Sequence, residues 1–285
     1  MKVSKNVLIV FLLPTLVGLI VFKIYPIFYA VYRSLYAHSF VHNIDTFVGV
    51  RNFTQLFSDP YFVNSLKTTL KFNAIINPVQ IIGAILLAEL ANRKLWGINI
   101  FRSIFLWPVV ISVPIVSIIW GLMLKPDGFL NSLLSSVGIP NQPFLISQSQ
   151  SLYSIILVSS WIGVSYWMIF ILAGLQEVPQ ELYEASRIDG ASLLQQFTHI
   201  TLPMIKRPIA FATVGATTAN FLLFAPIYTL TAGGPGGSTN LLMYEAYTSA
   251  FSYSDFGRSY AIVVILLLIL LVLVGAELRM LRGRF

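Results

Sequence analysis

The sequence predicts an all-α polytopic membrane protein, with six transmembrane helices in a single domain spanning residues 1–285. Its hydrophobic content is 56% and its charged content is 10%, whereas a soluble domain carries about a quarter charged residues. The mean hydropathy is +0.79. No stretch is polar enough for a separate soluble domain, and six apolar runs are long enough to cross a bilayer as helices.

The six predicted spans follow one another along the chain with polar segments between them. They cover about residues 7–24, 68–91, 103–124, 152–175, 208–230 and 260–281. The first run follows Lys2 and Lys5 as a signal peptide would, but no small-residue cleavage site comes after it, so an uncleaved helix is expected. Pro14 is tolerated there because neighbouring helices can satisfy the freed carbonyl. Residues 176–207 form the longest polar interruption.

The distribution of Lys and Arg indicates which side of the membrane each loop occupies. The net charge is +7, and basic residues accumulate in the cytoplasmic segments of membrane proteins, so no nucleic-acid partner is needed to explain the excess. Lys and Arg are about three times denser in the segments on the side of the two termini than in the segments on the opposite side of the membrane. Both termini and the loop 176–207 are therefore predicted to be cytoplasmic.

The residues present exclude several kinds of chemistry. Without cysteine, the chain has no thiolate nucleophile and no cysteine metal site. His38 and His42 stand four apart in a polar loop, 36–66, but no carboxylate matches them, so no metal site is predicted. Ser165 lies within the fourth predicted span, where an intramembrane serine protease would carry its nucleophile, but no histidine falls within a span to act as its base. No catalytic residue is therefore predicted. The glycine-rich segment 233–237 lacks the Gly-Lys-Ser/Thr ending of a phosphate-binding loop, so we expect it to bind no ATP and to form a turn entering the sixth span.

The middles of the predicted spans carry neutral polar and aromatic side chains. Lys71, Glu89 and Glu277 fall near span ends, where long side chains can reach the interface. Amide and hydroxyl groups beside aromatic rings suit a neutral, polyhydroxylated solute, because they offer hydrogen bonds and ring faces. The alternative role of each such polar side chain is to join neighbouring helices by hydrogen bonds. The candidates for a solute path are Asn73, Asn77, Gln80, Trp161, Ser165, Tyr166, Thr217, Asn220 and Phe224.

The loop 176–207 has the pattern of two short helices. Pro179 can begin the first, and Glu181 and Glu184 suit the positive end of its dipole. Gly190 permits a sharp bend. A second helix is expected from Ala191 to Ile200, with an apolar face on Leu193, Phe197 and Ile200, and with Pro203 and Pro208 ending it before the fifth span. Packing against the chain's own spans and docking of a partner protein are the two uses of such a face.

Within this loop, Glu184-Ala185-Ser186-x-x-Asp189-Gly190-Ala191 resembles the EAA loop of the permease subunits of bacterial ABC importers. Phe197, Ile200, Leu202 and Pro203 continue the likeness. Four further regions resemble the carbohydrate-uptake branch, the permeases for maltose-type sugars and glycerol 3-phosphate. They are Val48-Gly49-x-x-Asn52-Phe53 with Asp59-Pro60-x-Phe62, Phe101-Arg102 with Pro108, Leu175-Gln176-x-Val178-Pro179-x-Glu181-Leu182-Tyr183, and Gly233-Gly234-Pro235 with Ala250-Phe251 and Phe256-Gly257.

The chain departs from the family pattern at two positions. Ser186 replaces the second alanine of the loop, a change between small residues. Pro208 lies one residue further from Pro203 than the family has it, which puts the geometry of entry into the fifth span in question.

The resemblance implies the type I ABC importer permease fold, with a cytoplasmic coupling helix between helices 4 and 5 that sits in a groove of an ATPase subunit. The implied partners are a second homologous permease in a heterodimer, two ATPase subunits and a periplasmic or lipid-anchored solute-binding protein, all at the bacterial inner membrane with its lipid. ATP and Mg would be used by the ATPases, so this chain is expected to be no enzyme and to bind no cofactor. The coupling residues implied are Glu181, Glu184, Ala185, Asp189, Gly190, Ala191, Phe197 and Pro203.

The expected function is ATP-driven import of a carbohydrate by half of a translocation path. A neutral sugar, oligosaccharide or polyol glycoside is favoured, because no Lys or Arg falls in the middle of a span. Import of glycerol 3-phosphate or a related phosphodiester by the same mechanism is the alternative. A stand-alone, gradient-driven carrier would usually keep ionisable residues at mid-membrane, and it would have no use for the coupling loop.

Overall fold

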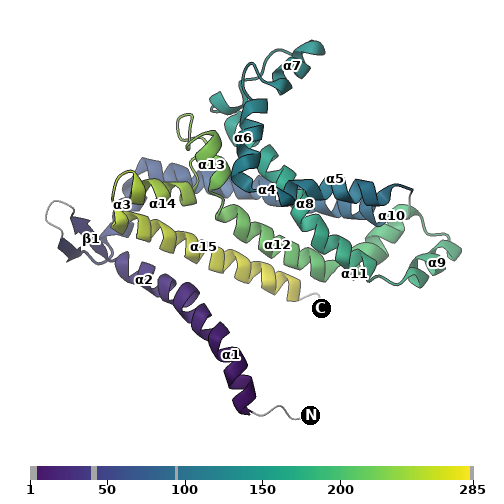
Figure 1. Cartoon of the computed structure of the whole chain (residues 1–285), viewed down its shortest axis with the longest axis horizontal. Coiled ribbons are helices and arrows are strands. Elements are labelled where there is room, and N and C mark those ends of the chain that lie inside the picture. Colours follow the sequence, from purple (N-terminus) through teal and green to yellow (C-terminus); the bar gives the residue numbers. More distant parts are fainter. Residues whose placement is uncertain (1–4, 40–43, 94–95, 283–285) are drawn as a thin grey trace. The chain divides into compact units, whose positions relative to one another are not determined.

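The computed structural model describes residues 5–39, 44–93 and 96–282, which are mostly helical (Figure 1). Two compact units are present. The first comprises the chain up to Val63 together with Glu245–Leu268, and the second comprises Asn64–Tyr244 and the chain from Ile269 onward. The boundaries between the units fall within the helices α4, α14 and α15.

The first unit begins with a long helical segment that is longer than the predicted first span. A π-helical turn, η1 (Ile20–Ile24), interrupts it just before Pro26. A two-stranded antiparallel hairpin and a short helix then occupy the segment expected to be a loop, with Tyr36 paired to Phe47. The elements that lie wholly or partly in this unit are α1 (Lys5–Leu19), η1, α2 (Tyr25–Arg33), β1 (Tyr36–Ser39), β2 (Ile44–Phe47), α3 (Arg51–Ser58), α4 (Pro60–Asn92), α14 (Leu242–Phe251) and α15 (Phe256–Arg282). His38 lies on β1, and His42 lies outside the described residues.

Several residues that carry the family resemblance have structural roles in this unit. Asn52 on α3 donates to the carbonyls of Ser34 at 2.7 Å and Tyr36 at 3.1 Å. A side chain at Gly257 would collide with the same Tyr36 carbonyl. The Asp59 carboxylate accepts the backbone N–H of Tyr61 at 2.9 Å, so it caps α4. These motif positions therefore hold the hairpin and the helix ends together.

Arg258 at the start of α15 is the centre of a partly buried ion cluster. Its guanidinium contacts the carboxylates of Asp59 and of Glu245, the latter at 2.8 Å, and donates through Nε to the Ser249 hydroxyl at 3.2 Å. The side chains of Arg258 and Glu245 are 22% and 8% exposed. The more exposed pair in this unit is Arg33 with Asp45, at 19% and 38%.

Arg258→Gln is expected to destabilise the protein by about 2–3 kcal/mol, because it leaves a buried carboxylate without its charge partner. Arg33→Gln breaks an ion pair nearer to water and should lower the stability by about 1 kcal/mol or less. Thermal unfolding of both variants in the same detergent measures the difference. Equal losses would show that the Arg258 cluster contributes no more than a surface pair.

The second unit packs α8 between other apolar helices. Ala84, Ala88 and Ala91 of α4 share one core cluster with Trp167 and Met168 of α8. In sequence order, the elements of the unit are α4 from Asn64, α5 (Ile98–Val110), α6 (Val113–Met123), α7 (Phe129–Ser136), η2 (Phe144–Ile146), α8 (Ser151–Gln176), α9 (Gln180–Ile188), α10 (Leu193–Gln196), η3 (Phe197–Thr201), α11 (Leu202–Met204), α12 (Lys206–Phe221), α13 (Ala225–Leu230), the start of α14 and the end of α15.

Three further predicted spans, the second, third and fifth, differ from the helices observed. The second was expected to begin at residue 68, but α4 begins at Pro60, because the carboxylate of Asp59 caps it and a proline suits a first helical turn. The third was expected to be continuous over 103–124, but α5 and α6 meet at a bend of 101°. The fifth was expected to run over 208–230, but it breaks after Phe221, and α13 begins only at Ala225.

Within the described ranges, four helical segments are long and apolar enough to cross a membrane, and the bent pair α5 and α6 would count as a fifth. They are Phe11–Arg33, Pro60–Asn92, Ser151–Gln176 and Phe256–Met280. The count of six is compatible with this set if α12 and α13 together form a broken span. The glycine-rich segment 233–237 leads into α14 rather than directly into the sixth span, because ten residues at Leu242–Phe251 form a helix of their own.

Candidate functional site

The loop between α8 and α12 begins with the helix α9, which the pattern of Pro179 predicted. Pro179 immediately precedes the helix, and Val178 beside it is buried. The hydroxyl of Tyr183 lies 3.0 Å from that of Thr201, which joins α9 to the second half of the loop. Tyr183 and Val178 also pack on the core cluster that contains Ala88 and Ala91 of α4. The loop is therefore fixed to the C-terminal end of α4.

Gly190 ends α9 in a left-handed conformation with φ of +77°. The N–H of Gly190 donates to the carbonyl of Arg187 at 3.1 Å, and that of Ala191 donates to Ser186 at 2.9 Å. These two bonds are a Schellman motif, in which the residue after the helix adopts positive φ and the last carbonyls are satisfied. The sharp bend expected at Gly190 is confirmed.

The second helix of the loop is shorter and more irregular than predicted. Ser192 begins it with a capping box, accepting from the N–H of Gln195 and donating to the side chain of Gln195. It then widens into the π-helical turn η3 (Phe197–Thr201). Pro203 does not end the helical segment as expected. It lies in the first turn of α11, because the widened turn before it removes the clash of a proline ring with the preceding carbonyls.

Pro208 does not end a helix either, because it lies in the first turn of α12. There its ring packs against Gly174 of α8, where any side chain would collide with it. The entry geometry that the unusual spacing of Pro208 put in question is thus a close contact between α8 and α12.

The surface of this loop combines acidic and apolar side chains, all in the second unit. Ile188 is 88% exposed, Leu193 is 76% exposed and Leu194 is 72% exposed. Leu193 was expected to share an apolar face with Phe197 and Ile200; Phe197 and Ile200 are partly buried, whereas Leu193 is exposed. The predicted coupling residues that are also exposed are Glu181, Glu184, Ala185, Asp189, Gly190 and Pro203, whereas Ala191 and Phe197 are partly buried. We call the exposed set, with Ile188, Leu193 and Leu194, the loop surface.

Polar side chains from α4 and α12 form one hydrogen-bonded network in the interior of the second unit. Asn220 donates through Nδ2 to Asn77 Oδ1 at 2.7 Å and to Gln80 Oε1 at 2.9 Å. Asn77 donates to the hydroxyl of Thr217 at 3.3 Å. Gln80 donates to the carbonyl of Ser159 on α8 at 3.2 Å. The network therefore joins three helices, and we call it the amide network.

Glu277 on α15 also belongs to the amide network. The Thr217 hydroxyl donates to Glu277 Oε1 at 2.8 Å, and the buried Glu277 Oε2 has no hydrogen-bond partner among the described residues. The expectation that Glu277 reaches the interface is wrong, because its carboxyl group turns to the polar side chain of a neighbouring helix. Glu277 is the one acidic residue of α15 and follows a long apolar run, and this was the signal that should have marked it, since acids within membrane helices are kept for use.

A cavity of about 290 Å³ lies beside the amide network. Gln80 and Asn220 line it together with the rings of Tyr166 and Trp167. Ser159 also lines it, and its buried hydroxyl has no partner in the part of the chain that the structure describes. We call this space the central cavity. Its lining offers amides, a hydroxyl and two aromatic rings, the combination that suits a polyhydroxylated ligand.

Glycines bring the helices close together around the central cavity. Gly163 on α8 also lines it, and a side chain there would collide with the amide of Gln80. Gly215 on α12 similarly faces the indole ring of Trp167. The break that follows α12 lines the cavity through Leu223. Irregular backbone of this kind is tolerated within a membrane where it lines a cavity.

The remaining path candidates lie away from the amide network. Asn73 is buried but donates to the carbonyl of Thr69 in its own helix. The hydroxyl of Ser165 likewise donates to the carbonyl of Trp161, one turn earlier. Trp161 packs edge-on against Trp120 with ring centroids 5.8 Å apart. Phe224 stacks on Tyr228 at 5.3 Å and on Tyr244 at 6.3 Å. Trp167, which lines the central cavity, was not among the predicted path residues.

Membrane-length helices, an exposed helical loop and an internal polar cavity are the features of an integral membrane transport protein. The chain belongs to the family of binding-protein-dependent transport system inner membrane components, whose model matches residues 80–278. The resemblance read from the EAA loop is thereby confirmed.

Two relatives align over almost the whole chain. The probable ABC transporter permease protein YurN of Bacillus subtilis is 37% identical over 279 residues, covering 95% of each chain. The sn-glycerol-3-phosphate transport system permease protein UgpA of Brucella suis is 32% identical over 275 residues, covering 96% of this chain and 94% of its own.

The fold also matches solved structures. A chain in the crystal structure of a bacterial ABC transporter involved in the import of the acidic polysaccharide alginate has a TM-score of 0.86. The two chains are 24% identical, and the match covers 98% of this chain and 96% of the alginate transporter chain. The predicted type I ABC importer permease fold is thereby confirmed.

Proposed function

We propose that this permease carries a carbohydrate inward through the central cavity, driven by ATPase subunits that dock on the loop surface. The observation that carries the proposal is the loop surface itself. Three large apolar side chains stand exposed beside Glu184 and Asp189 on a turn that Gly190 fixes. Exposed apolar groups of this kind in a polar surrounding mark a protein interaction site.

The proposed assembly follows the family pattern. A second homologous permease completes the translocation path as a heterodimer, and two ATPase subunits bind ATP and Mg. A periplasmic or lipid-anchored binding protein delivers the solute at the opposite face of the inner membrane. Both termini and the loop surface lie in the cytoplasm, as the excess of Lys and Arg on that side supports. This chain itself contributes no catalytic residue and no cofactor site.

The central cavity supports a sugar as the solute. Its amide and hydroxyl groups can exchange hydrogen bonds with sugar hydroxyls, and the rings of Tyr166 and Trp167 can pack on C–H surfaces. None of its lining residues is charged, which agrees with a neutral sugar, oligosaccharide or polyol glycoside. The relative UgpA is named for transport of sn-glycerol 3-phosphate, a phosphorylated polyol, and this similarity supports a polyol- or sugar-type solute.

Two other readings are each favoured by one observation. An anionic solute, such as glycerol 3-phosphate or a related phosphodiester, is favoured by a second pocket that carries Lys67 and Lys71. A gradient-driven carrier is favoured by Glu277, because a carboxyl group inside a membrane can take part in proton coupling.

Reconstitution of the chain with its partner subunits separates these mechanisms. We expect the permease to co-purify with an ATPase whose turnover rises severalfold when the binding protein and its solute are added. Proteoliposomes should then accumulate the solute only with ATP. Accumulation driven by a pH gradient, in vesicles that contain this permease and no ATPase, would replace the proposal with the carrier mechanism.

A further inference from the structure

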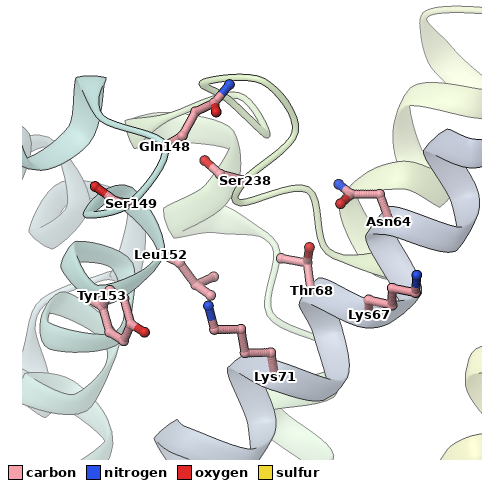
Figure 2. A pocket seen from close by; sticks show the side chains of 9 residues that line it. All are labelled: Asn64, Lys67, Thr68, Lys71, Gln148, Ser149, Leu152, Tyr153 and Ser238. Atoms are coloured by element: carbon pink, nitrogen blue, oxygen red, sulfur yellow. The ribbon is translucent and has the colours of Figure 1, made fainter.

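A second cavity in the same unit, of about 520 Å³, lies between the N-terminal part of α4, the start of α8 and the glycine-rich loop (Figure 2). Lys67 and Lys71 of α4 line it, one helical turn apart. Figure 2 shows the Lys71 ammonium directed toward Tyr153, whereas the Lys67 side chain extends in the other direction along α4. We call it the lysine pocket.

The lysine pocket lies at the end of α4 away from the loop surface. Lys71 precedes Ala88 by 17 residues, a rise of about 26 Å along a helix. Ala88 packs in the cluster that includes Tyr183 of the coupling loop. Since the hydrocarbon core is about 30 Å thick, the pocket and the loop surface belong to opposite faces of the membrane. Asn77 and Gln80 lie between them along α4, so a solute that enters at the lysine pocket has the central cavity ahead of it.

The charge of the lysine pocket is of one sign. Lys67 and Lys71 are i and i+4 on α4, so the two residues lie on one helix face. Neither forms an ion pair within the described ranges, and no carboxylate is among the residues that line the pocket. The Lys71 ammonium lies 5.4 Å from the centroid of the Tyr153 ring. Two positive charges in a concave site without an acid attract anions, because clefts lined by one sign of charge focus the field.

The wall opposite the lysines is held in place by specific contacts. Asn64 donates to the carbonyl of Gly237 at 2.9 Å, which ties the glycine-rich loop to α4. The hydroxyls of Ser238 and Ser151 lie 2.7 Å apart, which ties the same loop to α8. A side chain at Gly236 would collide with the amide of Gln148. The glycine-rich segment is thus tied to both α4 and α8, and Gln148 and Ser238 line the pocket together with the two lysines.

We propose that the lysine pocket binds an anionic group of the solute, a carboxylate or a phosphate, as the solute enters the permease. Lys67 and Lys71 neutralise the charge, and the surrounding amides and hydroxyls donate to the remaining oxygens. The inference rests on the proposed function, since it takes the central cavity as the next site along the path. The inference narrows the class of solute to an acidic sugar or a glycerol phosphodiester. The sequence favoured a neutral sugar because no Lys or Arg falls in the middle of a span, but Lys67 and Lys71 lie near one end of α4.

The test compares charged and neutral probes of the same size. The assembled transporter, in phosphatidylcholine nanodiscs, is offered glucuronate and glucose, or sn-glycerol 3-phosphate and glycerol, and saturation-transfer difference NMR measures their binding. Wild type should bind each anionic probe at least about fivefold more tightly than its neutral counterpart, the value of one close charge contact in water. The double variant Lys67→Gln/Lys71→Gln should lose this preference, and Lys67→Arg/Lys71→Arg should keep it. Lys125→Gln, at an exposed lysine that does not line the pocket, is the matched control.

The binding measurement uses neither ATP nor the binding protein. Its result can therefore be interpreted even if the reconstitution experiment shows no ATP-driven transport. Equal binding of charged and neutral probes by wild type, or an undiminished preference in the glutamine variant, overturns the proposal. Loss of the signal on adding phosphatidylglycerol assigns the pocket to a lipid headgroup and overturns it too. If the glutamine variant binds the probes as wild type does but needs more binding protein for half-maximal ATPase turnover, the lysines serve docking of that protein instead.

Discussion

Gly190→Val is expected to lower the solute-stimulated ATPase turnover of the assembled transporter about tenfold, while the chain still inserts and folds. Gly190 has φ of +77°, and no atom lies within 4 Å of the position that a Cβ would take. The effect is therefore one of backbone strain alone. An L-residue in this conformation loses about 1–2 kcal/mol, and a β-branched one is a genuine outlier. A penalty of that size changes the population of the closed turn by a factor of about 5–30.

The chain offers a matched control for this variant. Gly138, in the loop after α7, has φ of +79° and equally open surroundings. Gly138→Val should carry the same strain and leave the coupling of ATPase to solute unchanged. Gly190→Asn should also retain coupling, because asparagine tolerates the left-handed region. If both valine variants lower the stimulated turnover alike, the strain acts through general stability, and the coupling role of Gly190 fails.

The helix ends that the hydropathy pattern missed were marked in the sequence by caps and prolines. Asp59 and Pro60 fall within the predicted polar loop 36–66, yet a hydrogen-bond acceptor followed by proline also marks the start of a helix, and α4 begins there. Ser112, followed by Pro114 in the first turn of α6, marks the break of the third predicted span in the same way. Averaged hydropathy detects apolar composition but not the direction in which a proline or a cap turns the chain.

Both π-helical turns of the chain's described part follow a shared pattern. The turn η1 ends at Ile24, two residues before Pro26, and η3 ends at Thr201, two residues before Pro203. A widened turn lets the helix continue through a proline that would otherwise break it. The prediction that Pro203 perturbs the helix was therefore correct, but the prediction that it ends the helix was wrong.

The side-chain partners in the central region could not be predicted from the sequence. Asn77 and Gln80 were predicted as path candidates, and their separation of three residues puts them on one face of α4, where both belong to the amide network. Asn220, however, reaches Gln80 across 140 residues of chain, and nothing local indicates which faces of two helices meet. For the same reason Asn73, at an equivalent spacing, bonds only within its own helix.

Asn220→Leu is expected to have the second large effect, a loss of solute-stimulated ATPase turnover together with reduced thermal stability. Asn220 supplies the hydrogen bonds to Asn77 Oδ1 and Gln80 Oε1. Without it, two acceptors beside the central cavity lose their donor, and a buried group left unsatisfied costs about 1–3 kcal/mol. Leucine also replaces an amide on the cavity wall by an apolar group that offers a sugar hydroxyl nothing. Thr213→Val on the same helix removes a hydroxyl bonded only to the Ile209 carbonyl, so it should change neither quantity.

Comparing the two readouts decides between a solute path and a contact that only joins helices. If the amide network merely holds α4 and α12 together, Asn220→Leu lowers the melting temperature, yet the ratio of stimulated to basal turnover in the folded fraction stays at the wild-type value. If the network lines the path, that ratio falls even under conditions where the variant is fully folded. Asn77→Leu is the comparison variant, because Asn77 bonds to Asn220 and Thr217 but is not among the residues that line the cavity. A ratio that falls for Asn220→Leu and less for Asn77→Leu would place the contact with the solute on the cavity wall.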